Sequence, residues 1–535
     1  MNTLIKINYK YLRTIALYLI TLPALVFAVG WLKWYFALLF IICAIICLFF
    51  AVRSFANKPD KYIEIKLYTL IIIAVIAILW TWLSGIGGFW AQSKDYPWRN
   101  AIFRDLILRD WPVHYSNPNG FMSYYIGYWL FPAIFGKLAY IFGANEVWAF
   151  RIGNTALALW TVTLIFLLFL LLISLFKVRD IKKQVFVVLL FVFFSGLDLL
   201  GSIEPLGVNL YHIEWWADYW QYSSFTTCLF WVFNQSVIPW ICIALLLQEN
   251  DVSSFVHIGI MCLLCGPFPF IGYFIYAVTL GIIKFFKAIK DHKVFNFIKK
   301  VLSAQNLICA LIIFPFIGAF LLANDAIGGG GKLRINDENA FVLSEYSVDS
   351  QNVNSEAAID EIQSGNSLNI TIIGKYLAFV IVEFGLFAIL IVRKEYMNPL
   401  FYVTTFCLLI FPFLKMGNQA DFPMRASIPA IFLMYVFVTN FIISEKDCLK
   451  PKGSVKRLMF IVLVICVFIG AATPCVEFYR GCRQIALKGF DNPMEDFLYT
   501  LGSDGPYARE DAVYYLGNFG TNSPEEKIFF KYMCK

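Results

Sequence analysis

The stretch "LALWTVTLIFLLFLLLISLF", residues 157–176, contains no charged residue. About 20 apolar residues in a helix cross the hydrocarbon core of a membrane, so this stretch predicts a transmembrane helix. Similar runs recur through the 535-residue chain, which is 60% hydrophobic and only 15% charged. Soluble domains carry about 25% charged residues. The sequence therefore predicts an all-α polytopic membrane protein.

Basic residues gather in short stretches between the apolar runs, and loops rich in Lys and Arg stay on the cytoplasmic side of a membrane. The N-terminus is basic too, so we expect it in the cytoplasm. The net charge of +7 reflects these loops rather than a patch built for nucleic acid, and no nucleic-acid partner is expected. The five basic clusters are 53–66, 177–183, 284–300, 393–394 and 445–457.

The remaining polar stretches are then expected outside the cytoplasm. Segment 201–225 contains no Lys or Arg, and segment 324–369 carries eight acidic residues against two basic ones. Both compositions agree with an external position. The other external segments are 88–148, 417–426 and the tail after residue 475.

Two apolar runs, 121–143 and 149–176, separate the first external segment from the next cytoplasmic cluster, so only one of them crosses the membrane. Run 149–176 is the more aliphatic, whereas run 121–143 carries Pro132, Lys137 and many aromatic residues. Tyr and Trp prefer the membrane interface. We therefore expect run 121–143 as an interfacial helix within the first large external loop, 88–148.

About thirteen spans result, and they place the chain in the cell's cytoplasmic membrane with the N-terminus inside and the C-terminus outside. Residues 1–60 form two extra N-terminal helices, 61–474 the main bundle and 475–535 a small external cap. The predicted spans are 11–30, 34–52, 67–87, 149–176, 184–200, 227–248, 252–267, 269–287, 304–323, 370–392, 398–416, 426–444 and 458–474.

The first external loop is charged at its start, "SKDYPWRNAIFRDLILRD" (93–110), and leads into the next span through "IFGANEVWAFRIGNTALALW" (141–160). This order of a membrane helix, an acidic loop with interfacial helices and a long returning helix resembles the GT-C superfamily of membrane glycosyltransferases. That superfamily includes the protein O-mannosyltransferases and the aminoarabinose transferases. Gly143, Asn145, Glu146 and Arg151 fall on a pattern similar to one found there, and Asp95 lies where the catalytic aspartate of the superfamily lies.

The resemblance implies a GT-C-like bundle that moves a sugar from a polyprenyl phosphate to an extracytoplasmic acceptor, which is a glycan, a lipid or a protein. Such a reaction needs a base at the acceptor hydroxyl and cations at the leaving phosphate. Asp95 is the candidate base, with a solvated carboxylate or an ion-pair partner as the alternative. For Asp105 and Asp110 we favour ion pairs within one helix.

Asp198, in "FVFFSGLDLLGS" (191–202), is a second catalytic candidate, because ionisable groups near the end of a span are costly and often functional. A boundary carboxylate already in water is the alternative. Candidate substrate ligands follow at His212, Glu214 and Trp215, since aromatic faces suit sugar rings and carboxylates suit hydroxyls. Trp and Tyr also anchor a protein at the interface, so this alternative stays open.

Arg425 begins a late span with Asp421 nearby. A guanidinium there can bind the lipid phosphate with two hydrogen bonds, or it can pair with Asp421 to hold the fold. Arg151 and Arg99 are further candidates for the phosphate. His212 and Glu214 have no third metal ligand at a recognisable spacing, so the sequence requires no cofactor and leaves a divalent cation open.

Two competing functions remain at this stage. A flippase for lipid-linked sugars would show two similar halves, and the sequence shows no internal repeat. A polysaccharide polymerase or ligase would use a large late loop, for which 324–369 is the candidate. The glycine-rich start of that loop, 324–341, lacks the P-loop pattern and is expected to cover the site.

The cysteines suggest little chemistry. Cys262 and Cys265 lie in an apolar run and are expected to be packed as small hydrophobes. Cys475 and Cys482 lie beyond the last span, where an oxidising compartment would allow a disulfide.

Overall fold

The computed structural model is 77% helical. The predicted all-α class is therefore confirmed, with only short strands beside the helices. The structure describes residues 3–535 apart from 57, 117–118, 204–211, 218–219, 329–333, 336–364, 417–419, 445–454, 490–499 and 502–517.

The N-terminal part consists of three long helices and one strand pair. The side chain of Asn8 accepts a hydrogen bond from the Lys10 backbone N–H and so caps the first helix. The two strands pair antiparallel from Leu4↔Lys66 to Asn8↔Tyr62 and tie the start of the first helix to the start of the third. The elements are β1 (Leu4–Asn8), α1 (Tyr9–Trp31), α2 (Trp34–Ala56), β2 (Tyr62–Lys66) and α3 (Leu67–Leu83).

Segment 88–148, predicted as the first external loop, contains two helices, as expected, and both pack into the bundle. The first of them, Tyr96–Leu108, is almost wholly buried, because it packs between neighbouring helices. This burial differs from the predicted position at the membrane interface. Asn145 accepts from the Trp148 backbone N–H at 2.9 Å and caps the long helix that follows. The elements are α4 (Tyr96–Leu108), β3 (His114–Ser116), β4 (Asn119–Met122), α5 (Gly127–Ile141) and α6 (Glu146–Phe176).

The middle of the chain supplies the central helix, which is buried on all sides and bends at Val232, where φ is −136° and ψ is 37°. The long helix before it, Ile181–Phe193, ends earlier than the predicted span 184–200. Beyond its end, Ser195 packs against Gly470, and Gly196 packs against Glu383. The elements are α7 (Ile181–Phe193), α8 (Asp198–Gly201), η1 (Ile213–Ala217), α9 (Phe225–Gln248), α10 (Phe255–Leu263) and α11 (Pro267–Lys290).

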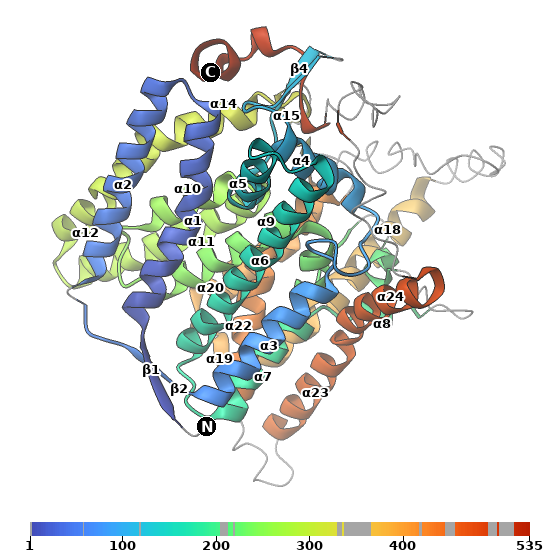
Figure 1. Ribbon diagram of the computed structural model, residues 1–535. Coiled ribbons are helices and arrows are strands. Elements are labelled where there is room, and N and C mark those ends of the chain that lie inside the picture. The colour runs from blue at the N-terminus through green and yellow to red at the C-terminus, as the bar shows by residue number, and fades with distance from the viewer. Residues whose placement is uncertain are drawn as a thin grey trace.

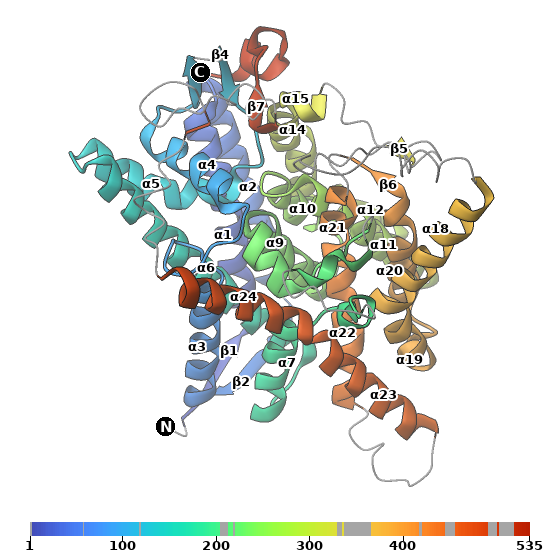
Figure 2. The ribbon, with the colours of Figure 1, turned by 90° about the vertical axis from the view of Figure 1, so that its right-hand side faces the viewer.

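The C-terminal half adds two of the helices that pack on α9, alongside helices from the earlier part of the chain. Figure 2 shows its last long helix crossing beside α9 and α7, and the short strand near the C-terminus extends the sheet in the order β3-β4-β7. The elements are α12 (Val294–Val301), α13 (Ala304–Ile308), η2 (Cys309–Ile313), α14 (Phe314–Leu322), α15 (Asp325–Gly328), β5 (Arg334–Ile335), α18 (Gly365–Val380), η3 (Ile381–Gly385), α19 (Leu386–Glu395), α20 (Pro399–Ile410), η4 (Phe411–Phe413), β6 (Leu414–Lys415), α21 (Asp421–Ala426), α22 (Ile428–Ser444), α23 (Val455–Gly470), α24 (Ala472–Lys488), β7 (Gly520–Thr521), η6 (Pro524–Glu526) and η7 (Phe529–Met533).

Among the described residues, nine helices are long and apolar enough to cross a membrane, and three shorter apolar helices accompany them. The membrane character is thus confirmed, while the count of thirteen spans, the domain bounds and the orientation stay predictions. The N-terminus and the C-terminus lie at opposite ends of the bundle (Figure 1).

Segments predicted on one side of the membrane meet at one end of the bundle. Lys58 pairs with Asp251 at 3.3 Å, joining two of the turns at the predicted cytoplasmic end. At the other end, Asn324 donates to the backbone oxygen of Asn518 at 3.1 Å. Both contacts join segments that the charge pattern places on the same side, while the orientation itself stays a prediction.

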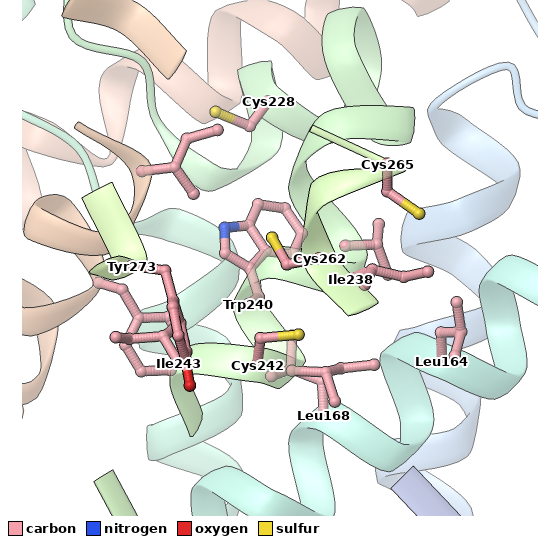
Figure 3. Close-up of a cluster of buried hydrophobic side chains, with 14 of the residues drawn as sticks. Leu164, Leu168, Cys228, Ile238, Trp240, Cys242, Ile243, Cys262, Cys265 and Tyr273 are labelled. Carbon is pink, nitrogen blue, oxygen red and sulfur yellow. The ribbon is translucent and has the colours of Figure 1, made fainter. Parts of the chain in front are cut away.

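Buried cysteines line the core around α9. Figure 3 shows Cys262 and Cys265 among apolar side chains near Trp240, as predicted for packing. The disulfide left open between Cys475 and Cys482 is not formed, because both cysteines are free and lie on α24. Seven residues of helix separate their backbones by about 10 Å, beyond the reach of a disulfide.

Candidate functional site

Asp95 lies directly before α4 and beside two buried polar groups. Its Oδ2 accepts from Arg99 Nη2 at 2.9 Å, and Arg99 Nη1 donates to Asn234 Oδ1 on α9 at 2.9 Å. The Asp95 side chain is 46% exposed, whereas that of Arg99 is 8% exposed. A buried guanidinium therefore fixes an accessible carboxylate at the end of α9.

Arg425, on α21, belongs to the same group. Its Nη1 lies 2.6 Å from Asp421 Oδ1, so the predicted pairing of these residues is formed. Burial alone would lower the pKa of Arg425, but Asp421, Tyr125, Tyr124 and Asp95 together raise it above its ordinary value. Asp95 and Arg425, distant in sequence, are thus within electrostatic range of each other.

Tyr124 and Tyr125 lie between the two arginines. Their hydroxyl groups are hydrogen-bonded to each other, and their ring centroids are 3.6 Å apart. Burial raises the pKa of both tyrosines, while Arg425 and Arg99 oppose the increase. We call this set the arginine cluster; its members are Asp95, Arg99, Tyr124, Tyr125, Asn234, Asp421 and Arg425.

A second group gathers five buried titratable side chains, three of which contact the start of α9. We call it the carboxyl cluster. Asp198 Oδ2 accepts from the hydroxyl groups of Ser195 at 2.9 Å and Thr473 at 2.7 Å, while its Oδ1 is buried without a hydrogen-bond donor among the described residues. The predicted water-exposed alternative for Asp198 is therefore wrong. The members are Asp198, His212, Glu214, Glu383 and Glu477.

Glu383, in η3, lies beside Asp198. Its Oε1 accepts from Trp216 Nε1 at 3.1 Å, and its carboxyl group is within hydrogen-bonding reach of Asp198. Gly196 packs against the Glu383 carboxyl so closely that a Cβ at this position would clash with it. Two acidic groups are thus held side by side in a buried place.

Glu214, in η1, is fully hydrogen-bonded. Its Oε2 accepts from Gln221 Nε2 and from the Ser223 hydroxyl, both at 2.8 Å, and its Oε1 accepts from the Ser224 backbone N–H at 2.9 Å. Burial raises the pKa of Glu214 to about 7, with His212 opposing and Asp198 adding to the shift. This carboxyl group therefore changes charge near neutral pH.

His212 connects this group to α24. Its Nδ1 lies 3.2 Å from Glu477 Oε1, and its ring stacks on Trp231 at 5.0 Å. Glu477 also pairs with Arg480, whose guanidinium covers the Trp231 ring at 4.6 Å. Trp215 packs edge-on against His212 and keeps an exposed face.

The two clusters flank the first turns of α9. The Cys228 thiol on this helix is within electrostatic range of both Glu214 and Arg425. The bend at Val232 lies between Cys228 and Asn234, which holds Arg99. A group with two guanidinium ions and a group rich in carboxyl side chains therefore both lie beside the first half of α9.

Arg151 lies apart, on α6, where its guanidinium covers the ring of Trp148 at 5.3 Å. Asp105 is fully buried and pairs with Arg104 at 3.2 Å and with Arg109, just after α4, at 3.6 Å, so the predicted ion pairing is confirmed for Asp105 and stays a prediction for Asp110. The glycine-rich loop falls mostly within 329–333 and 336–364, outside the described residues.

Glu383, Glu477 and Arg480 were missed from the sequence. The rule that an ionisable residue in an apolar run is a candidate site would have found Glu383 in "IVEFG" (381–385). Nothing local marks Glu477, because its partner His212 lies 265 residues earlier.

No set of three His, Cys, Asp or Glu side chains in the described part of the chain is arranged to hold a metal ion. Comparisons of the chain with models of protein families, with curated proteins and with solved structures give no match. Functional reasoning therefore rests on the residues of the two clusters.

Proposed function

We propose that this protein is a membrane glycosyltransferase that moves a sugar from a polyprenyl-phosphate donor to an extracytoplasmic acceptor. One observation carries the proposal: an accessible carboxylate, Asp95, lies within electrostatic range of two guanidinium groups, Arg99 and Arg425, at one end of the bundle. Sugar transfer from a lipid phosphate needs a base and cations in this arrangement.

In the proposed reaction, Asp95 accepts the proton of the acceptor hydroxyl as its oxygen bonds to the anomeric carbon. The bond from that carbon to the lipid phosphate oxygen breaks, and its electron pair stays on the phosphate. Arg425 and Arg99 stabilise this added charge, because guanidinium groups fork onto phosphate oxygens. The hydroxyl groups of Tyr124 and Tyr125, within electrostatic range of both arginines, are further candidate donors to this phosphate.

The carboxyl cluster is assigned to the acceptor side. Trp215 offers an exposed aromatic face, and Glu214 and His212 lie directly behind it. Sugar hydroxyl groups are bound by carboxylates, and sugar rings pack on aromatic faces. Asp198 and Glu383 position this group from the membrane side.

The test uses the purified protein in lipid nanodiscs with a panel of polyprenyl-phosphate sugars, and release of free polyprenyl phosphate is measured. Asp95→Asn is expected to lower turnover by about 10²–10⁴-fold, the range for a lost general base. Asp60→Asn is the matched control, because Asp60 also pairs with a cation, Lys10 at 2.9 Å, but at the opposite end. Equal turnover in the two variants would refute the proposal.

A flippase for lipid-linked sugars is the second candidate, favoured by the adjacent buried carboxyl groups of Asp198 and Glu383. Neighbouring acidic groups inside a membrane bundle suit proton-coupled transport. A flippase would move a labelled lipid-linked sugar across a vesicle membrane under a pH gradient without releasing polyprenyl phosphate. The polymerase or ligase alternative depends on 324–369, which lies mostly outside the described residues.

A further inference from the structure

A cavity of about 930 Å³ opens at the predicted cytoplasmic end, between the end of α2, the turn after α9, and helices α11 to α13. Its lining includes seven Lys and Arg side chains and only two Asp side chains. This cavity lies at the opposite end of the bundle from the two clusters, so it does not depend on the proposed function.

Part of the positive charge belongs to the fold. Asp251 accepts from Lys58 at 3.3 Å and from Lys300 at 3.0 Å, which ties the turn after α9 to its neighbours. Lys284 donates to the backbone oxygens of Glu249 at 3.2 Å and Asn250 at 3.1 Å. These three lysines form the frame of the cavity.

Three further lysines are left for a ligand. Lys287, Lys293 and Lys299 line the cavity, and among the described residues the ion pairs at this cavity use Lys58 and Lys300 instead. Three ammonium groups around one cavity repel each other unless an anion joins them. The chemistry of the cavity therefore favours a phosphate group.

Exposed apolar side chains, Leu302 in the lining and Phe286 and Phe295 next to lining residues in the chain, favour a lipid over a free phosphate. Phe295 is 80% exposed, Phe286 64% and Leu302 55%. Phe295 lies on α12, and Leu302 directly follows this helix. Helix α12 has lysines on one side and apolar residues on the other, and it stands at the edge of the bundle (Figure 1). Short amphipathic helices of this composition lie in the membrane interface, where headgroup and acyl chain meet.

We propose that this cavity binds the headgroup of an anionic phospholipid of the cytoplasmic leaflet. The phosphate contacts Lys287, Lys293 and Lys299, and the acyl chains run along Phe286 and Phe295. Basic pockets on the cytoplasmic side of helical bundles bind acidic headgroups by this combination of charge and apolar contact.

The experiment measures retention of phosphatidylglycerol against phosphatidylcholine by the full-length protein, using native mass spectrometry from mixed nanodiscs. The triple variant K287Q/K293Q/K299Q is expected to bind phosphatidylglycerol on the order of 100-fold more weakly, from about a fivefold loss for each charge. The matched control is K61Q/K182Q/K456Q, which removes the same charge from exposed lysines outside the cavity.

Unchanged retention in the cavity variant, or an equal loss in the control variant, would overturn the proposal. Inorganic phosphate is added as a competitor in a separate arm, and displacement of the lipid at micromolar phosphate would identify a site for free anions instead. Circular dichroism checks the fold of each variant. If the triple variant does not fold, the single changes are measured, and each is expected to weaken retention about fivefold.

Discussion

Replacing Asp105 by alanine is expected to destabilise the protein by about 4 kcal/mol, the cost of leaving buried arginines without their carboxylate. Asp105 is fully buried and accepts from the Tyr115 hydroxyl at 2.9 Å, the Thr500 hydroxyl at 3.0 Å and the Leu501 backbone N–H at 2.9 Å. It thereby holds α4, which carries Arg99, against residues near the C-terminus.

The magnitude follows from what remains after the change. Arg104 keeps a second partner, Glu146 at 3.3 Å, which places the cost in the middle of the usual range of about 3–5 kcal/mol. Tyr115→Phe removes one hydrogen bond to the same carboxylate and is expected to cost about 1.5–3 kcal/mol. Because both changes affect one network, their costs are expected to be less than additive.

The assay is reversible unfolding by denaturant in mixed detergent micelles, with the free energy of unfolding as readout. Asp110→Ala is the matched control, because Asp110 lies five residues further along and is exposed. A surface change of this kind costs within about 0.5 kcal/mol. If Asp105→Ala costs no more than Asp110→Ala, the described network does not stabilise the fold.

Three further outcomes are expected. The pKa of Glu214 is raised to about 7. Its contribution to the free energy of unfolding is therefore present at low pH and is lost as the pH rises through about 7. Glu214→Gln should remove this pH dependence from unfolding curves recorded between pH 5 and pH 8. Gly196→Ala should destabilise the protein by about 1–3 kcal/mol in the same denaturant assay, because its Cβ clashes with Glu383. Arg13→Met should lower the free energy of unfolding by about 3–5 kcal/mol, because it leaves the buried Glu249 unpaired. Adding Glu249→Leu should recover much of this stability. A double variant that is no more stable than Arg13→Met would contradict the pairing.

The helices were predictable because each apolar run is long enough to satisfy its own backbone in a membrane. The charge pattern also placed the segments joined by Lys58 and Asp251, and those joined by Asn324 and Asn518, on the same side of the membrane. The composition of "RDLILRD" (104–110) predicted ion pairs, but it did not reveal that Asp105 would be buried against Thr500. That contact joins positions 395 residues apart, and local periodicity carries no information about such a partner.

The candidate site was predictable where its residues stand out locally, and not where they are brought together by long-range packing. Asp95, Arg99, Asp421 and Arg425 were identified because charges at the end of an apolar run stand out, and the structure brings these residues together. The carboxyl cluster was only half identified, since Glu383 and Glu477 come from helices that reach it by packing. Arg151 fitted a motif in sequence, but its guanidinium covers the ring of Trp148, three residues earlier on the same helix.

The strand pair between β4 and β7 joins Phe121 to Thr521, positions 400 residues apart. A ribosome adds about 5–20 residues per second, so roughly 20–80 s pass between the synthesis of the two partners. During that time the edge of β4 stays unpaired, and an unpaired strand edge is a place where chains associate wrongly. Quality control in the cell therefore has a long interval in which to act on this nascent protein before its outer surface closes.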